Sequence, residues 1–239
     1  MTHLIGRALR GLRRGLGLGR SRPRLSPAER RQKDEVDSVC IGYSGDGHWN
    51  FFRTIARRPN LRKLCVLGVY HGRDVAYLSA LLAREGRGDA AIVGVDKFED
   101  TPCKDWPESA SGLSWRQAGF GEPPDIETTR RNLARLGLDR NVSLRKQEAE
   151  SFLAKTAEVF DFIYVDTSHD YHSTDRTIRL AMRRLNPDGT IAGDDFSDRG
   201  TWGVASAVRD SFVKFEVLSD WIWLARPSDY RGARGADEA

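Results

Sequence analysis

The chain has 239 residues, of which 39% are hydrophobic and 30% are charged, a balance typical of soluble globular proteins rather than of disordered or membrane-spanning ones. This length is enough for one α/β domain with short appendages and too small for two ordinary catalytic domains. The formal net charge of +4 comes from residues 1–31, which hold nine arginines and one acid and leave 29 basic against 33 acidic residues elsewhere. The mildly acidic body argues against a basic nucleic-acid-binding surface.

The N-terminal residues and the cysteines indicate the environment of the protein. Residues 1–25 are rich in arginine and poor in acids, so we expect a flexible basic arm, free or on a membrane surface, with an organelle-targeting signal as the alternative. No apolar run approaches the ~20 residues that cross a bilayer. The three cysteines lack CxxC spacing and indicate neither a disulfide framework nor a zinc site, which favours a reducing, cytoplasmic setting.

Two helices are predicted to form an N-terminal cap over residues 26–60. Ser26, Pro27 and Glu29 follow the order of a capping box, so the first helix should begin there and end near residue 37. A glycine-rich loop over residues 41–48 follows, and residues 49–58 are predicted to form a second short helix.

Between residues 61 and 227, short apolar strands alternate with helices. The expected strands are 64–70, 90–96, 141–146, 160–166 and 190–195, and the expected helices are 74–85, 125–137, 174–185 and 204–212. Such alternation indicates crossover units and a mostly parallel sheet. The last two strands, 215–220 and 221–227, are almost contiguous and should form an antiparallel hairpin. The fold class is therefore α/β: a Rossmann-like, seven-stranded sheet with helices on both faces, followed by a disordered tail over 228–239.

The segment 97–124 interrupts this alternation. It is rich in glycine, proline and serine and contains Trp106, Trp115 and Phe120. A loop of this length in a compact domain is usually functional or disordered. Because its aromatic residues favour a binding role, we predict a substrate lid, with a disordered insertion as the alternative.

A glycine turn follows the first strand of the alternating region. Gly68 and Gly72 lie in the sequence GVYHGRD, where the lack of a Cβ lets the backbone approach a ligand at the next helix N-terminus. The pattern is not GxGxxG, which argues against a nicotinamide cofactor. Asp96 ends the second strand, where a carboxylate can accept the ribose hydroxyls of an adenosine. The alternative for Asp96 is a solvated acid at a strand end.

Three further acids follow later strands. Asp166 ends FDFIYVD, and Asp194 and Asp195 end TIAGDD, so all three should lie at the carboxyl edge of the sheet, where open α/β folds bind ligands. Like charges at contact distance repel one another, and a divalent cation resolves this conflict. Oxygen ligands suit Mg²⁺ or a similar hard ion. The alternative is that some of these acids cap helices or face solvent.

A histidine lies three residues after the first of these acids. His169 follows Asp166 closely enough to share its site, and a neutral imidazole can take a proton from a hydroxyl group at neutral pH. Tyr171 and His172 are competitors for this role. The alternative for His169 is a loop histidine that is hydrogen-bonded to the backbone.

This set of residues resembles class I S-adenosylmethionine-dependent methyltransferases, in particular the metal-dependent small-molecule O-methyltransferases of the catechol and macrocin (sugar) types. The resemblance covers residues 61–227. It implies that S-adenosylmethionine is held by Gly68, Tyr70, Gly72, Asp96, Gln147 and Asp166, and that Mg²⁺ or another divalent metal is held by Asp166, Asp194 and Asp195.

Two positions depart from or refine this resemblance. The family usually has an acid two residues before the first glycine, where this chain has Val66, and we expect Asp74 to hold the ammonium group of the cofactor instead. His169 stands where the catechol type has a general-base lysine, and a histidine there is similar to bacterial sugar and natural-product methyltransferases.

The expected function is metal-dependent O-methylation of a small hydroxylated substrate, either a sugar of a natural product or a catechol-like group. One alternative is a nucleic-acid methyltransferase that uses the arginine-rich arm, although DTSH follows the fourth strand in place of a D/N-PP-Y/F motif. Another is a non-catalytic scaffold with the same fold. The pattern leaves open whether the chain forms a homo-oligomer.

Overall fold

One seven-stranded sheet organises the computed structural model, which describes residues 24–100, 112–119, 121–200, 202–218 and 221–234. The strand order is β3-β2-β1-β4-β5-β7-β6. The strands are β1 (Lys63–Leu67), β2 (Ala91–Asp96), β3 (Val142–Lys146), β4 (Phe160–Val165), β5 (Leu185–Gly193), β6 (Glu216–Val217) and β7 (Trp223–Ala225).

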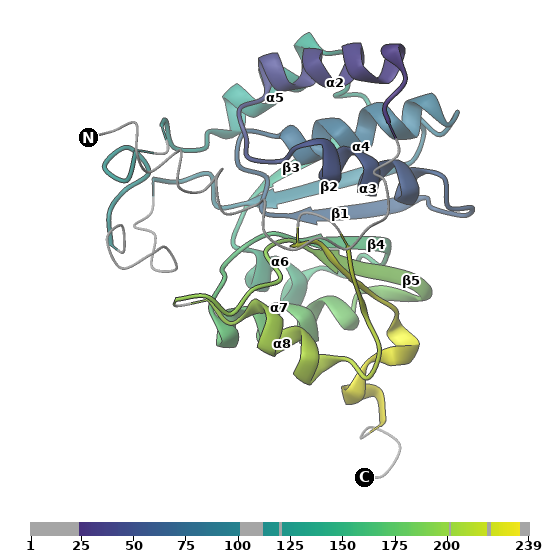
Figure 1. Ribbon diagram of the computed structural model, residues 1–239, viewed down its shortest axis with the longest axis vertical. Helices are drawn as coiled ribbons and strands as arrows, with labels where there is room; N and C mark the ends of the chain where they lie inside the picture. The colour runs from purple at the N-terminus through teal and green to yellow at the C-terminus, as the bar shows by residue number, and fades with distance from the viewer. Residues whose placement is uncertain (1–23, 101–111, 120, 201, 219–220, 235–239) are drawn as a thin grey trace.

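The pairing of these strands confirms the predicted fold class. Strands β1 to β5 pair in parallel, whereas β7 pairs antiparallel with both β5 and β6. The helices are α2 (Pro27–Val39), α3 (Asp46–Ala56), α4 (Arg73–Arg84), α5 (Ile126–Arg135), α6 (Ala149–Lys155), α7 (Tyr171–Met182) and α8 (Val204–Ser211). Helices α2 to α5 cover one face of the sheet, and α6 to α8 cover the other (Figure 1).

Strand β1 shows why the sequence of a central strand is a continuous apolar run. Alternate residues of a strand point to opposite faces, so Leu64 and Val66 join the core under α3 and α4, while Cys65 and Leu67 join the core against α7 and α8. All four side chains are fully buried. Burial on both faces is the physical reason that central parallel strands are apolar at every position.

The N-terminal cap is packed on the sheet rather than appended to it. Helix α2 begins with the predicted capping box, because Ser26 and Glu29 exchange hydrogen bonds. Glu29 also accepts a hydrogen bond at 2.8 Å from Arg53 of α3, and both residues are buried. Burial raises the pKa of Glu29, but the hydrogen bonds from Arg53 and Ser26 outweigh it and lower the pKa to about 2.

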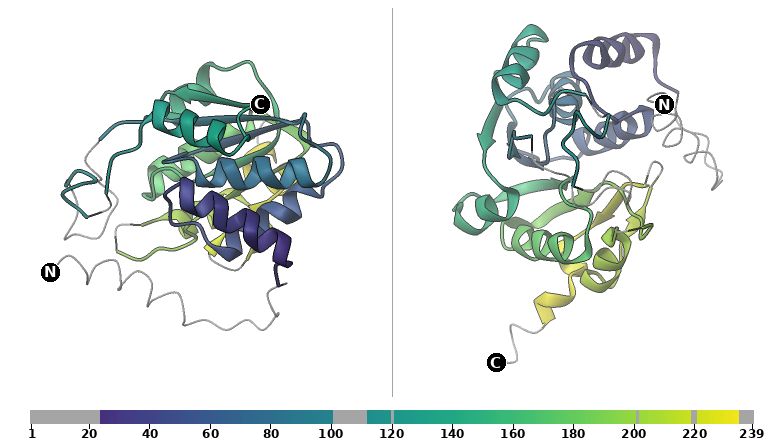
Figure 2. Two further views of the ribbon diagram at one scale, coloured as in Figure 1. Left: turned by 90° about the horizontal axis from the view of Figure 1, so that it is seen from above. Right: turned by 90° about the vertical axis from the view of Figure 1, so that its left-hand side faces the viewer.

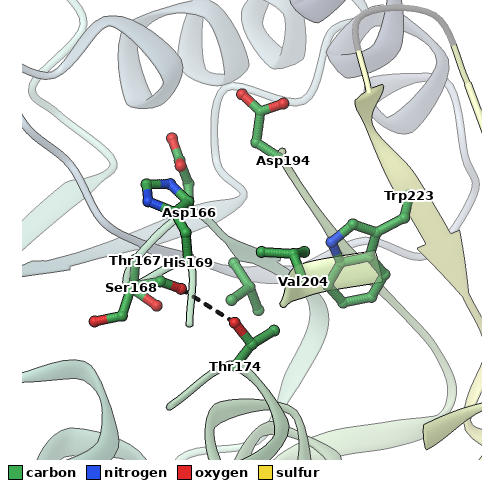
Figure 3. A pocket seen from close by; sticks show the side chains of 9 residues that line it. Asp166, Thr167, Ser168, His169, Thr174, Asp194, Val204 and Trp223 are labelled. Carbon is green, nitrogen blue, oxygen red and sulfur yellow. Dashed lines mark hydrogen bonds between the residues drawn. The ribbon is translucent and has the colours of Figure 1, made fainter. Parts of the chain in front are cut away.

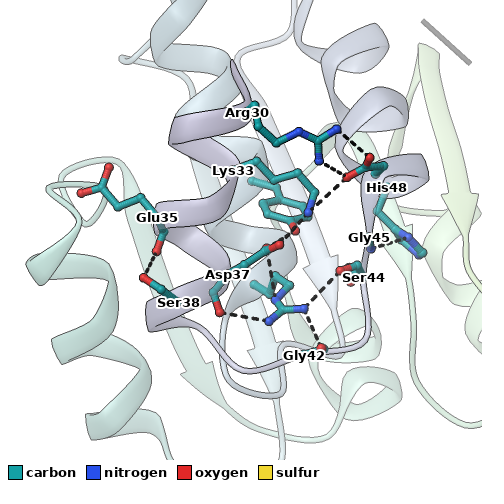
Figure 4. A network of polar contacts seen from close by, with 12 residues as sticks. Arg30, Lys33, Glu35, Asp37, Ser38, Gly42, Ser44, Gly45 and His48 are labelled. Carbon is teal, nitrogen blue, oxygen red and sulfur yellow. Dashed lines mark hydrogen bonds and ion pairs between the residues drawn. The ribbon is translucent and has the colours of Figure 1, made fainter. Parts of the chain in front are cut away.

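The loop between α2 and α3 is tied to the start of α4. Arg73 donates hydrogen bonds to the backbone carbonyls of Cys40, Gly42 and Ser44. Figure 4 labels Gly42 and Ser44 in this loop. Helix α2 lies beside α4 on the same face of the sheet, as the view from above in Figure 2 shows. The cap therefore has a fixed position relative to the glycine turn that precedes α4.

Several parts of the chain differ from the predicted elements. Helix α3 begins at Asp46, with Gly45 as its N-cap, so His48 lies in a helix and not in the expected loop. Helix α6 was not predicted, because seven residues carry too little periodicity to be recognised. The described part of the tail that was expected to be disordered from residue 228 has local structure: Pro227–Asp229 and Arg231–Arg234 form 3₁₀ turns, and Tyr230 bridges to Phe212.

Several predictions fall partly outside the described residues. These include the basic arm up to residue 23, the lid residues 101–111 with Trp106, Phe120, and the tail from residue 235. Within the described ranges, no helix is long and apolar enough to span a membrane. Cys40 and Cys65 are buried free thiols.

The close contact between Gly68, after β1, and Asp166, after β4, predicts that an alanine at position 68 lowers the stability of the fold. A Cβ at this position would lie 1.6 Å from the carbonyl oxygen of Asp166, and φ is +87°. We expect Gly68→Ala to lower the free energy of unfolding by roughly 3 kcal/mol or more. Gly86→Ala is the matched control, because φ is +71° and no atom lies within 4 Å of its added Cβ; it should cost about 1 kcal/mol. Urea unfolding measures both, and equal losses would contradict the steric account.

The Glu29–Arg53 pair predicts a pH dependence of stability. Because folding lowers the pKa of Glu29 from 4.5 to about 2, the pair stabilises the fold above the higher value and loses this effect as the pH falls toward the lower one. Glu29→Gln can still complete the capping box. It should lower the free energy of unfolding by roughly 1–3 kcal/mol at about pH 7 and by less at about pH 3. Urea midpoints at both pH values test this, and a pH-independent loss argues against it.

Candidate functional site

The candidate site lies at the carboxyl ends of β1, β2, β4 and β5. Strand β1 pairs with β2 on one side and with β4 on the other, so the connections from β1 and β4 leave the sheet in opposite directions. Open α/β sheets bind ligands at such a switch point. The predicted glycine turn and the later acids follow β1, β4 and β5, and Asp96 is the last residue of β2.

The turn between β1 and α4 has an unusual backbone. Gly68 and Gly72 have φ of +87° and +90°, and Tyr70 between them has φ of +52°. Left-handed backbone at a tyrosine is uncommon, and such strain gathers at ligand sites. The turn brings the backbone of residues 68–72 to the N-terminus of α4, as the sequence predicted.

Asp96 braces this turn. Its Oδ2 accepts hydrogen bonds from the amides of Val69 at 2.8 Å and Tyr70 at 2.9 Å, and its Oδ1 accepts one from Phe98 at 2.7 Å. A carboxylate has about four acceptor positions, so capacity remains for a ligand hydroxyl group. The backbone amide of Gln147 donates to the carbonyl of Asp96 at 2.9 Å, which places the predicted adenine segment beside the same strand end.

Aromatic rings gather over the turn. The ring of Tyr70 stacks on Trp115 with centroids 4.8 Å apart, and Tyr43 lies parallel to Tyr70 at 6.0 Å. These rings come from three separate parts of the chain: the loop between α2 and α3, the glycine turn, and the described part of the predicted lid. The contact of Trp115 with the turn supports a substrate-covering role, which stays a prediction.

Two acids and a histidine form a cluster beside the turn. Potential ligand atoms of Asp166, His169 and Asp195 all lie within 4.8 Å of one another, and Nε2 of His169 is 3.0 Å from Oδ2 of Asp195. The side chains of Asp166 and His169 face the same pocket (Figure 3). The ring of His169 stacks on Trp202, with centroids 4.6 Å apart.

Asp194 lies next to this cluster but has other partners. Its Oδ2 is 2.7 Å from Nε2 of His48, and its Oδ1 accepts a hydrogen bond from the amide of Asp195 at 2.8 Å. Figure 3 shows its carboxylate apart from Asp166 and His169. His48 comes from the first turn of α3 and is fully buried. The sequence contains no signal that relates it to Asp194, because 146 positions separate the two residues.

The electrostatics of the cluster favour a bound cation. Burial raises the pKa of Asp166 well above its ordinary value, and the nearby charges of Asp194, Asp195 and Asp74 raise it further. Burial also raises the pKa of Asp74, against the opposing effects of His48 and Ser44. A divalent or other cationic ligand would remove this repulsion.

Asp74 occupies a distinct place in the first turn of α4. It is 7% exposed, and its Oδ1 accepts no hydrogen bond from the part of the chain that the structure describes. A buried carboxylate oxygen without a donor is costly. This atom is therefore suited to a positively charged group of a ligand.

The competitors of His169 lie elsewhere. The hydroxyl of Tyr171 donates a hydrogen bond to Asp210 at 2.9 Å, and His172 is exposed on α7. Neither belongs to the cluster formed by Asp166, His169 and Asp195. Of the three side chains considered as a base, only His169 lies among the acids.

Comparison with known families identifies the class of the chain. Residues 65–196 match the model of a family described as a methyltransferase domain. The match covers more than half of the chain, which therefore belongs to the methyltransferase domain family and is a methyltransferase. A search of curated proteins finds no match.

Solved structures of low sequence identity share the fold. The O-methyltransferase NovP is 15% identical with a TM-score of 0.58, over 76% of this chain and 80% of NovP. TomG of Streptomyces achromogenes, an O-methyltransferase involved in tomaymycin synthesis and solved with SAM, is 14% identical with a TM-score of 0.52, over 85% and 90% of the two chains. An O-methyltransferase of Bacillus cereus, solved with SAH, is 14% identical with a TM-score of 0.53, over 92% and 97%.

The hydrogen bonds to Asp96 predict that the substitution Asp96→Asn destabilises the fold. In Asp96→Asn the side-chain NH₂ meets at least one backbone N–H donor, whichever way the amide is turned. We expect the free energy of unfolding to fall by roughly 1–3 kcal/mol without any ligand. Asp89→Asn is the control, because Asp89 is exposed and precedes the start of β2, at the other end of the strand from Asp96. This substitution should change the free energy of unfolding by no more than about 0.5 kcal/mol. Urea unfolding tests both variants. An unchanged free energy of unfolding in Asp96→Asn would show that these hydrogen bonds do not contribute to stability.

Proposed function

We propose that the protein transfers the methyl group of S-adenosylmethionine to a hydroxyl oxygen of a small molecule, with a divalent metal at the carboxylate cluster. The observation that carries this proposal is the contact between the two halves of the site. In a member of the methyltransferase domain family, the glycine turn lies against the backbone of Asp166, which is also part of the cluster of potential metal ligands.

The residues around the turn fit S-adenosylmethionine. Gly68 and Gly72 give the turn its left-handed backbone at the N-terminus of α4, where backbone N–H groups can bind a ligand. Asp96 has acceptor capacity for ribose hydroxyl groups, and Gln147 lies beside it. The unpartnered Oδ1 of Asp74 suits the ammonium group of the methionine part. These roles are the ones expected from the sequence.

The carboxylates fit a divalent ion. Asp166 and Asp195 offer oxygen ligands within 4.8 Å of each other, and Asp194 adds charge beside them. A divalent ion held there supplies Lewis acidity, which lowers the pKa of a hydroxyl group. His169 lies 3.0 Å from Asp195, and its ring could either accept the hydroxyl proton or bind the ion itself.

The proposed step is an in-line displacement. The substrate oxygen attacks the methyl carbon, so that an O–C bond forms while the S–C bond breaks. The electron pair of the broken bond stays on sulfur and yields S-adenosylhomocysteine, and the hydroxyl proton passes to a base. The chain contributes mainly by aligning oxygen, methyl carbon and sulfur and by excluding water. The rings of Tyr43, Tyr70 and Trp115 can shield that space.

We infer the substrate class from the same site. An ion with open positions binds two neighbouring oxygens of one molecule, which favours a catechol-like group or a sugar of a natural product. TomG, one of the structures with this fold, is involved in tomaymycin synthesis, and this is consistent with natural-product biosynthesis as the setting.

Binding of the demethylated product tests the cofactor site. We expect calorimetric titration of the full chain with S-adenosylhomocysteine to show saturable binding, and Asp74→Asn to weaken it about tenfold or more, because a charged hydrogen bond to the ammonium group is lost. Asp89→Asn should bind as the wild type does. Full affinity in Asp74→Asn would overturn the role of Asp74, and absence of any binding to the wild type would overturn the proposed function.

A further inference from the structure

The sequence assigns the metal to three aspartates, but the arrangement of the side chains differs. We propose that the ion of the proposed function is held by Asp166, His169 and Asp195, and that Asp194 is a positioning residue fixed by His48. This assignment rests on the proposed function and changes the kind of metal. A ligand set with one imidazole nitrogen favours a first-row transition ion over Mg²⁺, and Mn²⁺ serves below as the spectroscopic probe.

The first argument is the spacing of the three ligand atoms. Neighbouring ligands at ~2.1 Å from one ion lie roughly 3 Å apart. Nε2 of His169 and Oδ2 of Asp195 are 3.0 Å apart, and an oxygen of Asp166 completes a set within 4.8 Å. Among the residues that the structure describes, no set of three ligand atoms that includes Asp194 is this compact.

The second argument is the engagement of Asp194 by the N-terminal cap. Nδ1 of His48 accepts a hydrogen bond from the amide of Gly45 at 3.3 Å, so its Nε2 carries the hydrogen in the neutral ring and donates it to Oδ2 of Asp194 at 2.7 Å. Turning Asp194 toward the ion would leave this fully buried donor without its acceptor, which is unfavourable.

The third argument is the backbone that separates the two adjacent aspartates. Asp195 has φ of +55°, a left-handed conformation that aspartate tolerates better than most residues. Neighbouring carboxylates consequently reach different partners, Asp194 toward His48 and Asp195 toward His169.

His169 is also held in place for ligation. Its ring stacks on Trp202, and its backbone carbonyl accepts a hydrogen bond from the amide of Gly203 at 2.8 Å. A ring fixed on one face and directed at Asp195 loses little freedom on binding an ion. With Nε2 among the ligands, His169 is not the base that the sequence predicts.

Pulsed electron paramagnetic resonance of the full chain loaded with Mn²⁺ tests this assignment, because it detects a directly coordinated imidazole nitrogen. We expect the nitrogen coupling in the wild type, its loss in His169→Gln, and its persistence in Asp194→Asn and His48→Gln. His172→Gln is the matched control, because His172 is an exposed histidine three positions away. Titration of the free Mn²⁺ signal should show that His169→Gln raises the Kd about tenfold or more.

The outcomes separate this assignment from the function on which it rests. Bound Mn²⁺ without a coordinated nitrogen in the wild type, or with one that survives in His169→Gln, overturns the assignment of His169 and leaves a metal-dependent enzyme. No binding of Mn²⁺ or Mg²⁺ to the wild type overturns the metal itself. A wild-type spectrum without nitrogen coupling overturns the assignment even where a variant fails to fold, and circular dichroism identifies such a variant.

Discussion

The approach of Gly68 to the carbonyl of Asp166 is the constraint on which the site depends. A Cβ at Gly68 would lie 1.6 Å from that oxygen, so the ends of β1 and β4 can meet only through a glycine. The contact places the turn that suits the methyl donor next to the cluster that suits a metal. The proposed metal-assisted methyl transfer requires this adjacency, because the donor carbon and the acceptor oxygen held by the metal must lie in contact before reaction.

The N-terminal cap takes part in the site as well as in the core. Trp49 and Phe52 of α3 are fully buried against the sheet, and His48 from the same helix reaches Asp194. Arg73 fixes the loop that precedes α3. Helix α3 therefore has two roles. Its apolar side chains pack the cap on the sheet, and its His48 holds the side chain of Asp194 at the carboxyl edge of the sheet.

The sequence predicted the parts of this site that follow strand ends. A parallel strand buried on both faces is visible as an apolar run, and the acids that follow such runs, such as Asp96 and Asp166, must lie at one edge of the sheet. The hydrogen bond between His48 and Asp194 could not be predicted in this way, because it depends on how α3 packs over the sheet. The left-handed backbone of Asp195 is likewise set by tertiary contacts rather than by local propensity.

The pairing of donor site and metal site is tested most directly by a crystal structure of the protein with S-adenosylhomocysteine and Mn²⁺, recorded with anomalous diffraction. The nucleoside should lie on residues 68–72 with its ribose at Asp96, and one manganese peak should lie among Asp166, His169 and Asp195, close to the sulfur. A nucleoside bound elsewhere, or a cluster without a peak at saturating Mn²⁺, would contradict the proposed metal-dependent methyl transfer.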